Sequence, residues 1–208
     1  MNLDQMVAQM TASKSELRMK IAAKRTAIGQ RFKNSPQDAQ DLANMIAHRF
    51  LSLPETKSMT KVAAYANVGG EPPTDVIRRE LRKTKCEVWL PLAETTGELR
   101  WLPDNGDELT PGPMGIPTPR GEFVKGGLEQ VDAVLVPALA VTRGGVRLGR
   151  GAGYYDRALA GLARFSDGGP MRIALVYDDE IFDALPAEMH DERVDAIVTP
   201  RMMFMAEA

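Results

Sequence analysis

Hydrophobic and polar positions follow a helical pattern at the start of the chain. Leu17, Ile21 and Ile28 recur at roughly helical spacing among basic residues, and Ser13 with Glu16 forms a capping-box pattern beside them. We therefore predict a first helix over about residues 14–33.

A second start signal follows directly. Ser35 is a preferred N-cap residue, Pro36 suits the first helical turn, and Asp38 places a carboxylate in that turn. Apolar residues then recur at helical spacing until Pro54. Together the two predicted helices occupy about residues 14–53.

From about residue 60 to residue 200 the apolar residues instead form short continuous runs. Such runs are typical of strands that are buried on both faces. Helical patterns at residues 75–81, 155–163 and 179–185 alternate with them, which predicts an α/β fold with an open, mainly parallel sheet. The five predicted strands are Val62–Ala66, Val88–Leu92, Val131–Val136, Ile173–Tyr177 and Ala196–Thr199.

Three chemically rich segments each follow a predicted strand directly: residues 67–74, 142–156 and 178–180. Ligands of open parallel sheets bind beyond the carboxyl ends of the strands, so we expect these segments to converge on one cleft. The Pro- and Gly-rich residues 105–127 are predicted to form a long surface loop that could act as a lid.

The stretch from Arg147 to Asp156 carries the most specific chemical signal. It combines three alternate glycines with Arg147 and Arg150, and it ends in an aromatic pair and a carboxylate. Glycines let backbone N–H groups approach an anion, and arginines add permanently charged donors. The helix predicted from Tyr155 would point its N-terminus at the same anion, and Asp156 would lie beside it as a possible Mg²⁺ ligand. We predict a phosphate site.

This stretch matches neither of the two common nucleotide-binding motifs. No GxxxxGK[ST] occurs, and the Rossmann pattern would need glycine where Tyr154 stands. The alternative interpretation is a flexible Gly-rich turn between a strand and a helix. The two arginines and the terminal Asp156 favour the phosphate site.

Composition narrows the class of partners. The 208 residues include 26 Lys and Arg against 28 Asp and Glu, so the chain lacks the basic field of a dedicated nucleic-acid binder. The N-terminal segment carries Asp4 and is amphipathic and charged, which is unlike the basic and then apolar pattern of an export signal, and nowhere do 18 apolar residues run together. We expect a soluble, cytoplasmic protein that binds neither nucleic acid nor membrane. Cys86, the only cysteine, lies in an apolar run and is interpreted as a buried structural thiol.

Further candidate residues lie on the first helix and after the first strand. Lys14 and Arg18 are four residues apart and share one helix face, so both could reach a phosphate. Because this helix is basic along its length, a solvated face is the alternative. Glu71 follows the first strand, where a carboxylate could hold N–H donors of a substrate. Its alternative interpretation is a turn residue.

The last candidates cluster near the final strand. Asp191 could join Asp156 as an oxygen ligand for a hard cation. His48 and His190 do not make a zinc site, because further ligands at suitable spacing are absent. Asp195 directly precedes a strand and is interpreted as a structural cap. No Ser/His/Asp order or Cys/His pairing supports covalent catalysis.

Taken in order, these segments resemble the 5-formyltetrahydrofolate cyclo-ligase family, also called 5,10-methenyltetrahydrofolate synthetase, from about Lys14 to Thr199. The glycine stretch with its two tyrosines and aspartate is the most specific part. The matching positions are Lys14, Leu17 and Arg18; Tyr65, Glu71 and Thr74; Leu90 and Pro91; Gly115, Ile116, Pro117 and Pro119; Val136 and Pro137; Arg147 through Asp156; and Leu185, Pro186, His190, Asp191, Val194, Asp195 and Thr199.

The resemblance implies a single domain over residues 1–208, with the three-layer α/β/α arrangement shared with sugar-phosphate isomerases and CoA transferases. It implies an enzyme that uses ATP and Mg²⁺ to close 5-formyltetrahydrofolate to 5,10-methenyltetrahydrofolate through phosphorylation of the formyl oxygen, releasing ADP and phosphate.

The resemblance also implies roles for individual residues. Asp156 and Asp191 would hold Mg²⁺. Glu71, Arg150 and Tyr154 would bind the reduced folate, with Arg150 and Tyr154 at the reacting groups. The residues implied for ATP are Lys14, Arg18, Arg147, Leu148, Gly149, Arg150, Gly151, Ala152, Gly153, Tyr154 and Tyr155.

Three positions depart from the family pattern. Glu180 stands near a common glutamine, Met114 replaces a frequent aromatic residue, and Pro200 stands where an acidic residue is common. A non-catalytic protein that binds folate or nucleotide is therefore one alternative. A sugar-phosphate isomerase is another, although the Lys14 and Arg18 pair and the two aspartates argue against it. We expect a monomer or a weak homodimer.

Overall fold

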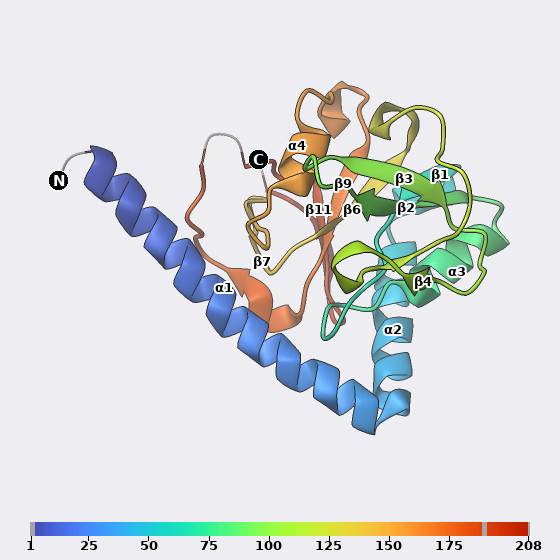
Figure 1. Cartoon of the computed structure of the whole chain (residues 1–208), viewed down its shortest axis with the longest axis horizontal. Helices are drawn as coiled ribbons and strands as arrows, with labels where there is room; N and C mark the ends of the chain where they lie inside the picture. The colour runs from blue at the N-terminus through green and yellow to red at the C-terminus, as the bar shows by residue number, and fades with distance from the viewer. Residues whose placement is uncertain (1–2, 189–190, 208) are drawn as a thin grey trace.

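A seven-stranded sheet forms the centre of the computed structural model, which describes residues 3–188 and 191–207 (Figure 1). Its strands are β1 (Lys61–Ala63), β2 (Glu87–Ala93), β3 (Leu99–Pro103), β6 (Ala133–Pro137), β9 (Met171–Leu175), β11 (Ala196–Val198) and β12 (Met203–Met205). The spatial order is β12-β11-β9-β6-β1-β2-β3. The inner strands pair in parallel, and the edge strands β3 and β12 are antiparallel. The predicted mainly parallel sheet is confirmed.

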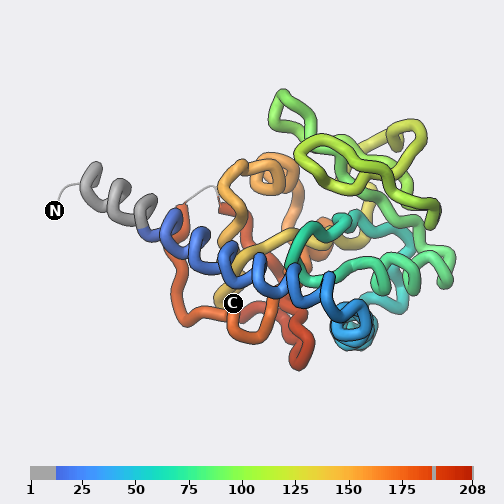
Figure 2. The backbone as a smooth tube through the Cα atoms, turned by 60° about the horizontal axis from the view of Figure 1, so that its bottom comes forward, coloured from blue at the N-terminus to red at the C-terminus, as the bar shows by residue number. Residues whose placement is uncertain are grey.

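Side chains of the inner strands alternate between two buried layers. Val62 and Ala64 pack in one apolar cluster with α2 (Pro36–Leu51) and α3 (Asp75–Lys83), whereas Ala63 faces a second cluster with α4 (Tyr154–Leu159). Helices thus cover both faces of the sheet, as the two views show (Figures 1 and 2). This is the predicted α/β architecture.

Helix α1 (Leu3–Asn34) extends along one side of the molecule (Figure 1). The prediction that it starts near Lys14 is wrong, because Leu, Gln, Met and Ala in the preceding segment favour a helix that continues through Ser13. Ile21 of α1 packs on Leu139, Ala140 and Leu148. Ala140 and Leu148 are part of a small second sheet, and Leu139 directly precedes it. This sheet has the order β10-β7-β8 and consists of β10 (Ile181–Phe182), β7 (Ala140–Thr142) and β8 (Arg147–Leu148).

The helix predicted over residues 179–185 is wrong. A 3₁₀ turn, η5 (Asp178–Glu180), leads into β10, which pairs in parallel with β7. The turn forms because Glu180 points inward to a buried partner, and Ile181 and Phe182 favour a strand.

Helix α4 is also shorter than predicted, since it ends at Leu159 before Gly161, which has a φ of +79°.

Within the predicted surface loop 105–127, β4 (Thr110–Pro111) and β5 (Pro117–Thr118) form a hairpin around η2 (Pro113–Gly115). The remaining short 3₁₀ helices are η1 (Pro54–Lys57), η3 (Leu128–Gln130) and η4 (Phe165–Asp167).

Two structural interpretations of single residues are confirmed. Cys86 is buried, and burial together with nearby Asp132 raises the pKa of its thiol to about 11. Asp195 accepts a hydrogen bond from the backbone N–H of Arg172 at 2.7 Å, as a cap does. Within residues 3–188 and 191–207, no helix combines the length and apolar character that a membrane crossing requires.

Candidate functional site

Two adjoining cavities lie at the carboxyl ends of the inner strands. The first, the apolar cavity, has a volume of about 230 Å³ and includes Tyr65, Glu71, Met114, Tyr154 and Tyr155 in its lining. The second, the charged cavity, has a volume of about 210 Å³ and is lined by Lys14, Arg18, Arg147, Leu148, Gly149, Gly151, Gly153, Asp156, Glu188 and Asp191. Both cavities share Arg147, Gly149, Gly151, Gly153 and Asp156. The glycine stretch is therefore a common wall.

This wall connects β8 to α4 without regular structure. Gly151 and Gly153 have φ angles of +102° and +69°, which L side chains rarely adopt, so glycine is required at both positions. Helix α4 has only six residues. The helix N-terminus predicted beside the glycine stretch therefore belongs to a helix of less than two turns.

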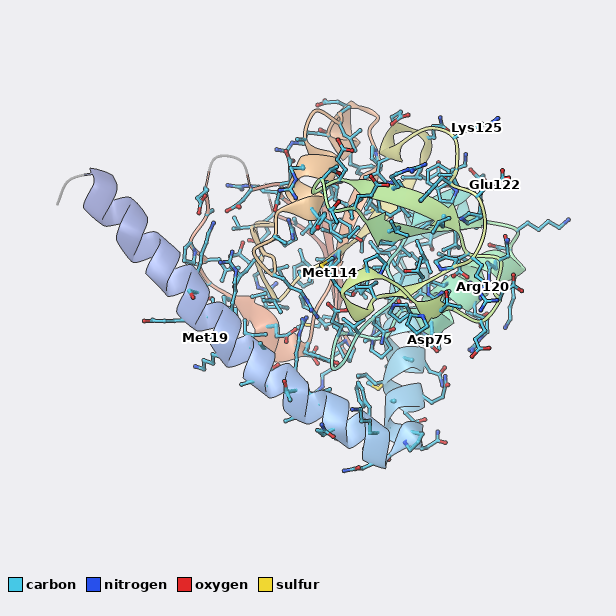
Figure 3. The ribbon with its side chains drawn as sticks, viewed as in Figure 1. Met19, Asp75, Met114, Arg120, Glu122 and Lys125 are labelled. Carbon is cyan, nitrogen blue, oxygen red and sulfur yellow. The ribbon has the colours of Figure 1, made fainter. Side chains whose placement is uncertain are left out.

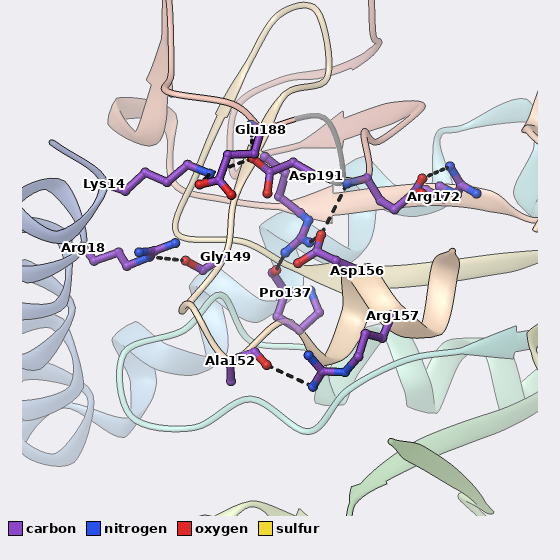
Figure 4. Close-up of polar contacts among 12 residues, drawn as sticks. Lys14, Arg18, Pro137, Gly149, Ala152, Asp156, Arg157, Arg172, Glu188 and Asp191 are labelled. Carbon is purple, nitrogen blue, oxygen red and sulfur yellow. Dashed lines mark hydrogen bonds and ion pairs between the residues drawn. The ribbon is translucent and has the colours of Figure 1, made fainter. Parts of the chain in front are cut away.

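Lys14 and Arg18 of α1 reach the charged cavity together (Figure 4). Lys14 is only 5% exposed, and its Nζ donates to Glu188 Oε1 and Asp191 Oδ2, both at 2.8 Å. Burial alone lowers the pKa of Lys14, but the two carboxylates outweigh it and raise the pKa overall. Arg18 Nε donates to the carbonyl of Gly149 at 2.9 Å. The solvated-face interpretation is wrong for these two residues.

Arg147 and Asp156 form an ion pair across the common wall. Arg147 is buried, and its Nη1 also donates to the carbonyl of Pro137 at 3.2 Å. The backbone N–H of Glu192 donates to the same Asp156 oxygen at 3.3 Å (Figure 4). Arg147 Nε is buried and has no hydrogen-bond partner among the described residues. The pair thus fixes both the start and the end of the glycine stretch.

Glu71 lines the apolar cavity and follows β1. Its carboxylate is 5% exposed and accepts hydrogen bonds from Val68 N at 2.9 Å and from Arg150 Nη2 at 2.6 Å. The Arg150 side chain is 55% exposed. Glu71 is therefore both a turn residue, because it binds the backbone three residues earlier, and a residue of the cavity lining.

The two tyrosines of the glycine stretch have different surroundings. Tyr155 packs beneath the loop with its ring edge against Trp101, at a centroid distance of 6.5 Å. Its hydroxyl is buried without a hydrogen-bond partner among the described residues, and burial together with Glu71 raises its pKa. Tyr154 donates its hydroxyl to the carbonyl of Glu94 at 3.1 Å.

Other candidate positions have structural partners. Leu148 is buried in the contact with α1, and the carbonyl of Ala152 accepts a hydrogen bond from Arg157 Nη2 at 3.0 Å (Figure 4). Met114, in the 3₁₀ turn η2 between β4 and β5, lines the apolar cavity although it is 66% exposed (Figure 3). His190 lies outside the described residues.

Residues 178–180 do not join the two cavities, contrary to the expectation of a single cleft. Glu180 instead binds Arg25, which donates Nε to Oε1 at 2.9 Å and Nη2 to Oε2 at 2.7 Å. Both side chains are buried, with exposed fractions of 6% and 1%. The Arg25–Glu180 pair was not predicted from the sequence, where it is marked only by an acidic run after β9 and a basic run in α1.

The charged cavity holds oxygen donors suited to a hard cation. Asp156 and Asp191 both line it, with side-chain exposures of 20% and 16%. No cluster of three or more His, Cys, Asp or Glu side chains arranged to hold a metal was found in the described part of the chain. Two carboxylates nevertheless fit Mg²⁺, which is commonly held by one or two carboxylates together with substrate phosphates and water.

Comparison with known proteins identifies relatives over nearly the whole chain. The family model described as the 5-formyltetrahydrofolate cyclo-ligase family matches residues 10–200. A protein of Mycolicibacterium smegmatis named 5-formyltetrahydrofolate cyclo-ligase is 34% identical over 200 residues, covering 93% of this chain and 97% of that protein.

Two solved structures are similar as well. The NMR structure of Aquifex aeolicus 5,10-methenyltetrahydrofolate synthetase has a TM-score of 0.74 and 31% identity, covering 94% of this chain and 93% of that one. A 5,10-methenyltetrahydrofolate synthetase from Mycoplasma pneumoniae, with a TM-score of 0.68 and 22% identity over 90% of this chain and 98% of that one, supports the fold alone. The chain belongs to the 5-formyltetrahydrofolate cyclo-ligase family of enzymes.

Proposed function

We propose that this enzyme closes 5-formyltetrahydrofolate to 5,10-methenyltetrahydrofolate at the expense of ATP, with Mg²⁺, releasing ADP and phosphate. The observation that carries the proposal is the wall shared by the apolar and the charged cavities. A ring system in the first cavity and a triphosphate in the second would meet across the glycine stretch. Phosphoryl transfer needs such positioning together with charge neutralisation.

The charged cavity supports the nucleotide part of the proposal. Lys14, Arg18 and Arg147 bring three cations to it, and the glycine stretch lines it at Gly149, Gly151 and Gly153. Lys14 and Arg147 are already paired with carboxylates. Binding of a triphosphate would replace these carboxylates by phosphate oxygens, so that each cation keeps a negatively charged partner.

Asp156 and Asp191 are the residues we propose for Mg²⁺. When bound, the ion would neutralise charge on the phosphates during transfer. The same carboxylates pair with Arg147 and Lys14 in this structure, so the chain keeps the acidic side chains beside the basic ones that would hold the phosphates.

The apolar cavity supports the folate part. Glu71 presents a buried carboxylate that can accept hydrogen bonds from N–H groups of a pterin, and Arg150 and Tyr154 lie along the same lining. A formamide oxygen is a poor leaving group. Its attack on the γ-phosphate would expel ADP and convert the oxygen to a phosphate ester. N10 would then bond to the former formyl carbon and lose its proton, while the C–O bond breaks and phosphate leaves. We propose that Arg150 and Tyr154 orient these reacting groups.

We further propose that residues 1–208 act as one domain in the cytoplasm. Helix α1 supplies Lys14 and Arg18 to the site and is held to the core by the Arg25–Glu180 pair. The single, unpaired Cys86 suits a reducing compartment.

The test is absorbance in the ultraviolet band of methenyltetrahydrofolate, with purified protein, 5-formyltetrahydrofolate, Mg²⁺ and ATP. We expect a rise that disappears when ATP is omitted. No rise, although calorimetry detects binding of ATP or folate, would instead support a non-catalytic binding protein.

A further inference from the structure

A third cavity extends from the site along helix α1. This α1 groove has a volume of about 540 Å³. One side consists of residues on a single face of α1, from Arg18 to Lys33, and the other side includes residues 68–71. At its base Gly29 and Gly70 bring the helix and the turn after β1 together, since a Cβ on Gly29 would lie 3.1 Å from Gly70 N.

The α1 groove continues from the apolar cavity. Val68, Glu71 and Arg150 line both of them. A molecule whose ring system lies in the apolar cavity can therefore extend past the Arg150–Glu71 pair into the groove. The groove also touches the charged cavity at Arg18.

Among the described residues, the unpaired positive charges of the α1 groove lie at its two ends. Of its four cations, Arg25 is neutralised by Glu180 and Arg150 by Glu71. Arg18 and Lys33 form no ion pair within the described part of the chain. They are separated by fifteen residues of helix, or about 22 Å at 1.5 Å per residue.

Between these two cations the groove is mostly uncharged. Met19, Ala22, Val68 and Leu139 contribute apolar surface there. Met19 lies on α1 and is 63% exposed, so the groove has a large uncovered apolar side chain (Figure 3). The pattern is therefore an apolar passage with a cation at each end.

Resting on the proposed function, we propose that the α1 groove binds the acidic tail of the folate. That tail is a p-aminobenzoyl ring followed by one glutamate or by several γ-linked glutamates. The ring suits the apolar passage, and the first carboxylates fall near Arg150, since Arg18 faces the triphosphate proposed for the charged cavity. Additional γ-linked glutamates extend along α1 toward Lys33, which lines this groove and neither of the other two cavities.

The experiment compares 5-formyltetrahydrofolate carrying one glutamate with the same compound carrying three. Lys33→Ala should raise KM for the triglutamate about two- to five-fold, the effect of losing one exposed ion pair, and leave KM for the monoglutamate unchanged. The difference should shrink as salt is raised, because exposed charges are screened. The matched control is Lys20→Ala, since Lys20 is exposed on α1 but does not line the groove.

Equal triglutamate KM values in Lys33→Ala and the parent would overturn the assignment, and so would equal losses in Lys33→Ala and Lys20→Ala. A second measurement needs no turnover: calorimetry with p-aminobenzoyl-γ-triglutamate, which lacks the pterin. We expect weaker binding to Lys33→Ala than to the parent, and equal binding would also overturn the assignment. If the parent binds this probe through Lys33 but turns over neither folate, the proposed function fails and the tail site stands.

Discussion

Two arginine–carboxylate pairs near the site differ in what they can do. Arg25 and Glu180 are both buried, and Arg25 makes two bonds to the carboxylate and a third to the carbonyl of Ala138. In the Arg150–Glu71 pair the carboxylate is also buried, but the guanidinium is 55% exposed. A ligand can displace the exposed guanidinium at little cost, whereas separating the buried pair strands a charge. The Arg25–Glu180 pair therefore stabilises the fold. The Arg150–Glu71 pair can open, so that a ligand takes the place of the guanidinium.

The strongest test of this comparison is Arg25→Ala, which leaves the Glu180 carboxylate buried without its partner. We expect the free energy of unfolding to fall by about 3–5 kcal/mol, measured by urea denaturation. Arg150→Ala should lose less than about 1 kcal/mol. If Arg25→Ala does not fold, Glu180→Gln provides the milder change, since it keeps an acceptor for Arg25. A Glu180→Gln protein as stable as the parent would contradict the structural role of the charge.

Asp156→Asn tests the Arg147–Asp156 pair, whose carboxylate is more exposed than those of the other two pairs. The amide keeps the size of the side chain but removes the charge proposed for Mg²⁺. We expect kcat to fall by about 10²-fold or more, as for loss of one electrostatic group in a transfer site, while the circular dichroism spectrum is retained. Unchanged turnover would refute the metal assignment.

Arg150→Ala tests the Arg150–Glu71 pair in catalysis. We expect kcat/KM for the folate to fall about tenfold, because a hydrogen bond to a charged group is worth about 1.5 kcal/mol. Glu71→Gln should also reduce it. If the two residues act as a unit, the double variant will be less impaired than the product of the single effects predicts. Kinetics of Arg150→Ala identical to the parent would remove Arg150 from the site.

Lys14→Met has only a small expected effect on the free energy of unfolding, and this effect depends on pH. Because Glu188 and Asp191 raise the pKa of Lys14 above its ordinary value of 10.5, the stabilisation is complete below pH 10.5 and is lost as the pH rises through the folded-state pKa. The stability difference between the parent and Lys14→Met, about 1 kcal/mol, should therefore shrink above pH 10.5 in denaturation experiments. A difference that stays constant to pH 11.5 would show that the charge of Lys14 does not contribute.

The sequence predicted those parts of the molecule that depend on local pattern. Continuous apolar runs identified the five inner strands, because strands buried on both faces need apolar residues at every position. Gly151 and Gly153 marked a loop with unusual backbone angles, because glycine adopts positive φ most easily.

The parts that depend on distant partners could not be predicted in this way. The spacing of Lys14 and Arg18 predicted one helix face that could reach a phosphate, but it could not show the contact with residues 188 and 191 that buries Lys14. Glu180 looked like the start of a helix, but its partner Arg25 lies 155 residues earlier. Periodicity carries no information about pairs at such separations.

The contact between Arg25 and Gly70 has a consequence for how activity in this enzyme could be tuned. A methyl group on Gly70 would lie 1.9 Å from the carbonyl oxygen of Arg25, so the turn and the helix touch backbone to backbone. That contact sets the spacing between the helix that carries Lys14 and Arg18 and the turn that carries Glu71. Gly70 has no side chain, yet it sets the distance between the two sides of the site. One added carbon atom at Gly70 would displace Lys14, Arg18 and Glu71 relative to one another, although none of these residues is itself changed.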